Sequence, residues 1–303
     1  MTDLSVDLGF LRLKNPVIAA SGTFGYGLEF RPFLDLSRLG GFVVKGLYYD
    51  SRPGNPPPRL VETAGGLINA IGLQGIGVRS FAEEILPDLE GLDTAVMVNV
   101  CGADDDEYAA VVEYLNEFAG IAAYELNISC PNVQLEGRCP AMDPEATFRI
   151  VQQVKKISQR PLITKLTPNA ADVAAVALSA QEAGSDAVSL VNTFLALAVD
   201  AETRKPRLAN RFGGLSGPAI KPLALRLVFQ TAARISIPVI GMGGIMSATD
   251  AVEFMIAGAA AVQVGTANFV DPQATVAIID GLEEYGRRHG LQKISDLTGT
   301  LHS

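Results

Sequence analysis

The sequence has few of the residues that most often carry acid–base and metal chemistry. It contains two histidines, His289 and His302, both near the C-terminus, and three cysteines, Cys101, Cys130 and Cys139. The scarcity of histidine argues against the usual imidazole base. The cysteines form no C-x-x-C pair and are too few for a four-cysteine zinc or iron–sulfur site, so we predict no metal centre. An odd number of cysteines without an export signal predicts a cytoplasmic location.

Positive charge and long apolar stretches are also in short supply. The 24 basic residues against 33 acidic ones give a formal charge of −9, whereas a nucleic-acid-binding protein needs a basic face to neutralise phosphates. No apolar run reaches the roughly 20 residues that a membrane-spanning helix requires. We therefore expect neither a nucleic-acid partner nor a membrane segment. No linker divides the chain, so we predict a single domain over residues 1–303.

Short apolar runs alternate with helical stretches along the whole chain. Near-continuous apolar strands separated by helices are typical of a parallel sheet covered by helices, and closure at eight strands gives an α/β fold, the (β/α)8 TIM barrel. The intervals 46–94 and 192–217 are too long for simple crossovers. They predict insertions at the C-terminal mouth of the barrel, the first with hairpin structure. The eight runs are residues 16–20, 42–45, 95–100, 124–128, 162–166, 187–191, 238–241 and 261–264.

Each run ends in a small or polar group, at the rim where barrels build their active sites. Lys45 and Lys165 are the most informative, because a lysine directed into a barrel needs an anionic partner or loses its proton. No carboxylate stands beside either one in the sequence, so we predict that both contact an anionic ligand. Gly243-Gly244 and Gly265-Thr266 predict a phosphate cup of backbone N–H groups, with Gly217 as a third wall.

The segment Asn127-Ile128-Ser129-Cys130-Pro131-Asn132 places a thiol at the mouth of a strand, between two amides. Pro131 ends the strand because proline cannot donate to the ladder. With histidine scarce, Cys130 is a leading candidate for the group that handles a proton. A lone cysteine is more often a buried structural residue, and these residues alone leave both interpretations open.

Taken together, these motifs resemble the FMN-binding subunit of dihydroorotate dehydrogenase, from about residue 4 to 289. Residues 20–26 and 52–59 are similar to the soluble branch that uses NAD, and not to the branch that uses fumarate. The cysteine at position 130 is unlike the membrane branch, which has serine there. The resemblance rests on Ala20-Ser21-Gly22, Val44-Lys45-Gly46-Leu47, Asn69 with Gly72-Leu73, Asn127 to Asn132, Lys165, Val191-Asn192-Thr193, Gly243-Gly244 and Gly265-Thr266.

The resemblance implies that dihydroorotate is oxidised to orotate in pyrimidine (UMP) biosynthesis. Cys130 would remove a proton from C5 while a hydride passes from C6 to N5 of FMN. Lys165 would lie near the N1–O2 edge of the flavin. The substrate positions implied are Lys45, Asn69, Gly72, Leu73, Asn127, Asn132, Asn192 and Thr193. The FMN positions implied are Ser21, Lys45, Gly46, Asn99, Asn127, Lys165, Val191, Gly217, Gly243, Gly244, Gly265 and Thr266.

The resemblance also implies partners. A homodimer of this chain would join a second subunit that carries FAD and a 2Fe-2S cluster, giving a heterotetramer that reduces NAD. The alternatives are a fumarate-linked dihydroorotate dehydrogenase and another FMN barrel such as a tRNA dihydrouridine synthase, which needs a basic face for RNA. A flavin-free isomerase or aldolase of sugar phosphates would share the barrel and the phosphate cup. A non-catalytic flavin-binding protein would have no need of Cys130.

Overall fold

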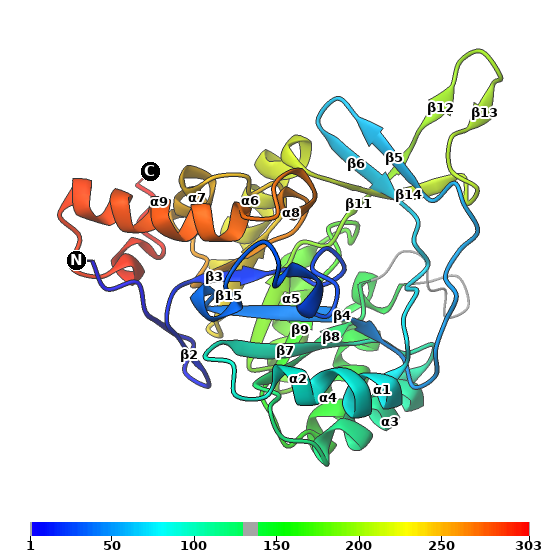
Figure 1. The fold of residues 1–303 in the computed structure, drawn as a ribbon, viewed down its shortest axis with the longest axis horizontal. Helices are drawn as coiled ribbons and strands as arrows, with labels where there is room; N and C mark the ends of the chain where they lie inside the picture. The colour runs from blue at the N-terminus through cyan, green and yellow to red at the C-terminus, as the bar shows by residue number, and fades with distance from the viewer. Residues whose placement is uncertain (1, 130–138, 303) are drawn as a thin grey trace.

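The computed structural model describes residues 2–129 and 139–302, and its centre is a closed barrel of eight parallel strands (Figure 1). The strands lie side by side in the order in which they follow along the chain, and the last pairs with the first to close the barrel. This confirms the predicted α/β TIM barrel. The strands are β3 (Val17–Ala19), β4 (Gly41–Leu47), β7 (Ala95–Val100), β8 (Ala123–Asn127), β9 (Leu162–Lys165), β10 (Ala187–Leu190), β15 (Val239–Met242) and β16 (Ala261–Val264).

Helices cover the outside of the barrel and pack apolar faces against it. Asp104, Asp143, Asp172 and Ser247 accept backbone N–H bonds at the starts of four of them, which stabilises the helix ends next to the strands. The covering helices are α3 (Asp105–Asn116), α4 (Pro144–Ile157), α5 (Val173–Glu182), α6 (Lys221–Ala232), α7 (Ala248–Ile256), α8 (Ala267–Val270) and α9 (Ala274–His289). A further helical stretch joins α1 (Val78–Ser80), a π-helical turn (Phe81–Ile85) and α2 (Leu86–Leu89).

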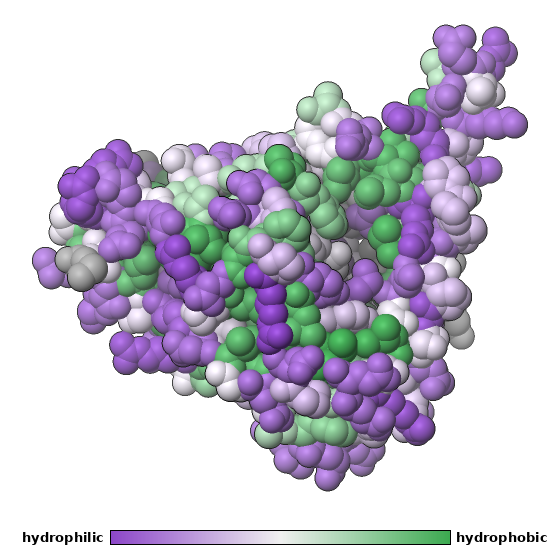
Figure 2. Space-filling view, in the orientation of Figure 1, coloured by the Kyte–Doolittle hydropathy of each residue, from purple (hydrophilic) through white to green (hydrophobic). Residues whose placement is uncertain are grey.

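The two predicted insertions come together in one antiparallel sheet. β5 (Leu60–Thr63) and β6 (Gly66–Asn69) form the hairpin expected in the first insertion, and β11 (Phe194–Leu197) and β14 (Phe212–Ser216) come from the second. The strand order is β11-β14-β6-β5, so β14 joins the two insertions by pairing with β6. A small hairpin of β12 (Val199–Asp200) and β13 (Lys205–Pro206) projects from this sheet at the upper right of Figure 1. Its surface in Figure 2 is mostly hydrophilic.

The remaining elements are short. β1 (Val6–Asp7) and β2 (Arg12–Leu13) pair near the N-terminus, and single 3-10 turns span Leu28–Phe30, Leu36–Arg38, Pro140–Met142, Pro218–Ile220 and Ile294–Leu297. One large cluster of buried apolar side chains runs through the barrel and its helices, and a second, small cluster lies under the insertion sheet. Among the described helices, none is both long and apolar enough to cross a membrane.

Candidate active site

A cavity of about 410 Å³ lies at the C-terminal mouth of the barrel, bounded on one side by the insertion sheet. Its size falls in the range of small-molecule and cofactor sites. Every sequence-predicted site residue that the structure describes lies on its wall. These residues are Ser21, Lys45, Gly46, Asn69, Gly72, Leu73, Asn99, Asn127, Lys165, Val191, Asn192, Thr193, Gly217, Gly243, Gly244, Gly265 and Thr266. The two other predicted positions, Cys130 and Asn132, lie outside the described residues.

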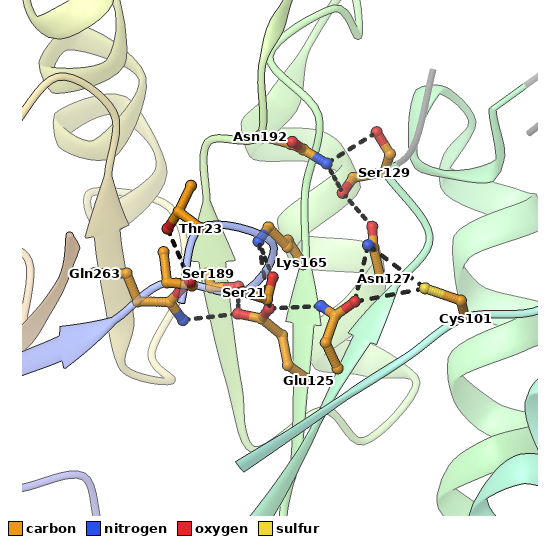
Figure 3. A network of polar contacts seen from close by, with 12 residues as sticks. Ser21, Thr23, Cys101, Glu125, Asn127, Ser129, Lys165, Ser189, Asn192 and Gln263 are labelled. Atoms are coloured by element: carbon orange, nitrogen blue, oxygen red, sulfur yellow. Dashed lines mark hydrogen bonds and ion pairs between the residues drawn. The ribbon is translucent and has the colours of Figure 1, made fainter. Parts of the chain in front are cut away.

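Glu125, which the sequence did not single out, lies at the centre of the polar groups below this cavity (Figure 3). The side chain is fully buried, and it extends from β8 into the barrel. Its Oε1 atom accepts from Asn99 Nδ2 at 2.7 Å and lies 3.3 Å from Lys165 Nζ. The expectation that Lys165 has no carboxylate beside it is therefore wrong. The two residues are far apart in the sequence, but they lie on neighbouring strands.

Three further side chains complete the environment of Glu125, each from a different part of the barrel. Ser189 on β10 donates to Oε2 at 2.9 Å, and Gln263 on β16 donates to the same atom at 2.7 Å. Ser21, which follows β3, donates to Oε1 at 3.3 Å. Burial alone raises the pKa of a carboxyl group, but the Lys165 charge and these hydrogen bonds outweigh it, so the pKa of Glu125 is lowered. Glu125 is thus a buried carboxylate and Lys165 its countercharge.

A chain of amide and hydroxyl contacts leads from Glu125 to the cavity mouth. Asn127 Nδ2 donates to Asn99 Oδ1 at 3.0 Å, and Ser129 Oγ donates to Asn127 Oδ1 at 2.9 Å. Asn192 Nδ2 in turn donates to Ser129 Oγ at 2.9 Å. These bonds fix the orientation of Asn127 and Asn192 and hold Ser129, the residue before Cys130, in a buried position. The thiol of Cys101 lies within 3.7 Å of Asn127 Nδ2.

Lys45 lies on the same cavity wall but in a different electrostatic state. Burial and the nearby charge of Arg59 lower its pKa, and Glu29 only partly offsets them. Its ammonium makes no hydrogen bond or ion pair with another described residue. Arg59 also lines the cavity. This wall therefore presents two cations, and an anionic ligand would stabilise both.

The glycine-rich exits of β15 and β16 form another part of the cavity wall. Among the described residues, the backbone N–H groups of Gly243, Gly244, Gly265 and Thr266 donate to no backbone carbonyl in any turn, loop or cap. A Cβ atom on Gly265 would meet nothing closer than Ala20 Cβ at 3.7 Å, and Ala20 is itself a cavity residue. The backbone of Gly265 is therefore open to the cavity. Ser247 caps the helix that follows β15, and Asp250 completes a capping box.

Sequence reasoning missed Glu125, Gln263 and Arg59. The signal for Glu125 was a single charged residue inside an otherwise apolar strand, Tyr124-Glu125-Leu126. Gln263 had the same signal in β16, between Val262 and Val264. Polar groups in buried strands need partners, and here each is the partner of the other. Gln263 Oε1 nevertheless accepts no hydrogen bond from the described part of the chain, although it is buried and the residue lines the cavity.

Comparison with known proteins identifies the family of this chain. Residues 3–285 match the profile of the dihydroorotate dehydrogenase family. The chain belongs to this family. A Solibacter usitatus relative with the provisional name dihydroorotate dehydrogenase A (fumarate) is 54% identical over 96% of each chain. The Bacteroides fragilis dihydroorotate dehydrogenase B (NAD(+)), catalytic subunit, is 49% identical over 99% of each chain.

A solved structure supports the fold of this family member. The crystal structure of DHODH from Eimeria tenella in complex with ferulenol superposes with a TM-score of 0.81. It covers 98% of this chain and 88% of that one, at 22% sequence identity. The resemblance stated from the motifs is thus confirmed at the level of the family. The family match over residues 3–285, and not the shared fold, decides against a tRNA dihydrouridine synthase and against a flavin-free isomerase or aldolase.

Proposed function

We propose that this chain oxidises dihydroorotate to orotate in pyrimidine biosynthesis, with FMN as its bound cofactor. The observation that carries the proposal is the set of polar groups gathered on the cavity wall. It joins an ammonium without a described partner on Lys45, oriented amides on Asn127 and Asn192, and open backbone at Gly265. The names of the relatives support the choice of substrate.

The described residues fit a flavin mononucleotide. Gly243, Gly244, Gly265 and Thr266 offer backbone N–H groups for one phosphate. Gln263 Oε1 is a buried acceptor without a donor among the described residues, and a ring N–H of the cofactor would satisfy it. Lys165, whose ammonium also contacts Ser21, would hold the ring. When bound, FMN supplies the acceptor for a hydride.

The remaining cavity residues would bind and orient the substrate. Dihydroorotate carries a carboxylate and an imide edge that both donates and accepts hydrogen bonds. Asn69, Asn127 and Asn192 suit that edge, because amide side chains also donate and accept. Lys45 offers a positive charge to the carboxylate. Burial and the Arg59 charge lower the pKa of Lys45, and a bound anion would offset both.

Cys130 would be the general base that removes the proton from C5. Ser129 is buried, and its bonds to Asn127 and Asn192 fix the chain at the cavity mouth one residue before Cys130. A thiol with a thiolate form near neutral pH can accept such a proton, as positioned bases do.

The proposed electron acceptor is NAD, reached through a partner. The Bacteroides fragilis relative is named as a catalytic subunit of an NAD(+) enzyme. We propose that a homodimer of this chain binds an electron-transfer subunit with FAD and a 2Fe-2S cluster, giving a cytoplasmic heterotetramer. Three cysteines in this chain are too few for a four-cysteine cluster. Fumarate is the second candidate, since the Solibacter usitatus relative bears that acceptor in its name.

Two measurements test this assignment. Acid release of the cofactor followed by mass determination should yield FMN, and recovery of FAD, or of no flavin from freshly prepared protein, would contradict the proposal. With dihydroorotate, the chain alone should reduce dyes but reduce NAD slowly, and addition of the partner subunit should accelerate NAD reduction. Rapid NAD reduction by the chain alone would refute the partner. Efficient turnover with fumarate alone would establish the second candidate.

A further inference from the structure

We propose that Glu125 is a positioning residue that sets the effective charge of Lys165 at the cofactor cavity. The inference rests on the proposed function, because it concerns the reduction potential of the bound flavin. It goes beyond that function, because Glu125 does not line the cavity and would act through Lys165, which does.

The contacts of Lys165 with the described residues leave one N–H donor of its ammonium unused. An ammonium has three N–H donors. Lys165 uses one toward Ser21 Oγ at 3.0 Å and one toward Glu125 Oε1 at 3.3 Å. The residue also lines the cavity, so its third donor is available to a ligand there. Figure 3 shows the ammonium of Lys165 above both Ser21 and the carboxylate of Glu125. A ligand atom bonded to Lys165 would thus lie closer to the ammonium than to the carboxylate.

The contacts of Glu125 show that its charge is held in place. Its carboxylate is fully buried and accepts from Asn99, Ser189 and Gln263 in addition to Lys165 and Ser21. Among the described residues, Lys165 is the only charged group bonded to it. A buried charge with this many donors stays ionised and does not rotate away. The two residues therefore form a fixed dipole with no net charge and with its positive end toward the cavity.

This arrangement predicts the direction in which removal of each charge shifts the equilibrium constant for flavin reduction. Reduction adds negative charge to the flavin, and positive charge beside the ring favours the reduced form. Glu125→Gln removes the compensating charge and leaves Lys165 as a bare cation, so it should raise the equilibrium constant for flavin reduction by roughly ten- to hundredfold. A tenfold change corresponds to about 30 mV for a two-electron couple. Lys165→Met should lower the same constant. The double variant should return to within about threefold of the wild type, because the charges cancel.

The experiment is the midpoint potential of the FMN in the purified holoprotein, measured by anaerobic dye equilibration for the wild type and these variants. Glu125→Asp, which keeps the charge, should stay close to the wild type. The matched control is Asp186→Asn. Asp186 pairs with Lys155 at 2.5 Å and accepts from the N–H of Leu162, at the end of β9 away from Lys165. The Asp186→Asn substitution removes one negative charge outside the cavity, as Glu125→Gln does inside the barrel, and should leave the flavin potential unchanged.

Each outcome decides the inference. A raised potential in Glu125→Gln with a near-normal double variant supports it. If Glu125→Gln does not fold, a double variant whose potential lies above that of Lys165→Met supports it. An unchanged potential in Glu125→Gln with full FMN content would overturn it and leave the proposed function intact. An equal shift in Asp186→Asn, or failure of both Glu125→Gln and the double variant to fold, would assign Glu125 to the barrel core alone. A wild-type protein without FMN would overturn both the inference and the proposed function.

Discussion

Replacement of Gly265 by alanine should separate the cofactor site from the stability of the fold. The Cβ atom of the variant would lie 3.7 Å from Ala20 and 3.9 Å from Thr23, which are ordinary van der Waals contacts. The backbone of Gly265 does not adopt a positive φ angle, so alanine fits it without strain. Alanine also reduces the conformational freedom of the unfolded chain, which typically stabilises a protein by about 0.4–1 kcal/mol. The apoprotein should therefore be as stable as the wild type or slightly more stable.

The same methyl group would enter the cavity beside the proposed phosphate cup. It would push the phosphate away from the backbone N–H groups of Gly265 and Thr266. Loss of one hydrogen bond to a charged group costs about 1.5–3 kcal/mol, so the affinity for FMN should fall roughly ten- to hundredfold. The assays are urea denaturation of the apoprotein and fluorescence titration of the apoprotein with FMN.

Gly91→Ala provides a control with the opposite expected pattern. Gly91 has φ +78° and nothing within 4 Å of its Cβ position, and it lies outside the cavity. Alanine there should cost about 1–2 kcal/mol of stability through the left-handed backbone and leave the FMN affinity unchanged. Unaltered FMN affinity in a folded Gly265→Ala protein would refute the assignment of the phosphate cup.

Two further predictions concern the ionisable groups at the cavity. Burial and Arg59 lower the pKa of Lys45 in the folded chain. Between that lowered pKa and the ordinary value of 10.5, the unfolded chain therefore binds more protons than the folded chain. The free energy of unfolding should rise with pH across this window. Lys45→Met should remove that rise in urea denaturation of the apoprotein, and an unchanged slope would contradict the placement of Lys45. Cys130→Ala should slow flavin reduction by dihydroorotate roughly 10²–10⁴-fold in stopped-flow measurements. Cys139→Ala should change it little, because the Cys139 thiol donates to the backbone carbonyl of Ile128 at 3.1 Å and does not line the cavity. Near-normal single-turnover reduction by Cys130→Ala would eliminate Cys130 as the base.

The barrel was predictable because its strands are buried on both sides. Each of the eight apolar runs overlaps an observed strand, as residues 42–45 do with Gly41–Leu47. Polar residues at the ends of these runs marked the rim, and they line one cavity because parallel strands bring their carboxyl ends together.

The insertion sheet was only partly predictable, because β14 contains Gly213 and Gly214 and glycine is depleted in strands. The structure shows why both are glycine. A Cβ atom on Gly213 would lie 2.6 Å from Asn69 O, and one on Gly214 would lie 1.9 Å from Thr193 Oγ1. Only glycine fits at these two positions, because segments that are distant in the sequence approach the β14 backbone closely. A prediction from strand propensity does not include such contacts.

The ion pair of Glu125 and Lys165 escaped prediction for a similar reason. The order of residues shows a charge in β8 and another in β9, but not that both side chains enter the same barrel interior. The register between β8 and β9 decides which of their side chains enter the barrel interior together. Asn127 lies opposite Lys165, and Glu125, two residues earlier, presents its side chain on the same face of β8 as Asn127. The presence of a lone carboxylate in a buried strand was the available signal, and it calls for a countercharge elsewhere in the core.

The central claim is that dihydroorotate delivers its electrons to FMN bound in this cavity. The most direct measurement is an anaerobic titration of the purified protein with dihydroorotate, followed by the visible absorbance of the flavin and by the orotate formed. The account predicts that the flavin absorbance bleaches as dihydroorotate is added, with orotate appearing in an amount equal to the flavin reduced. A flavin that stays oxidised in excess dihydroorotate, or bleaching without formation of orotate, would contradict it.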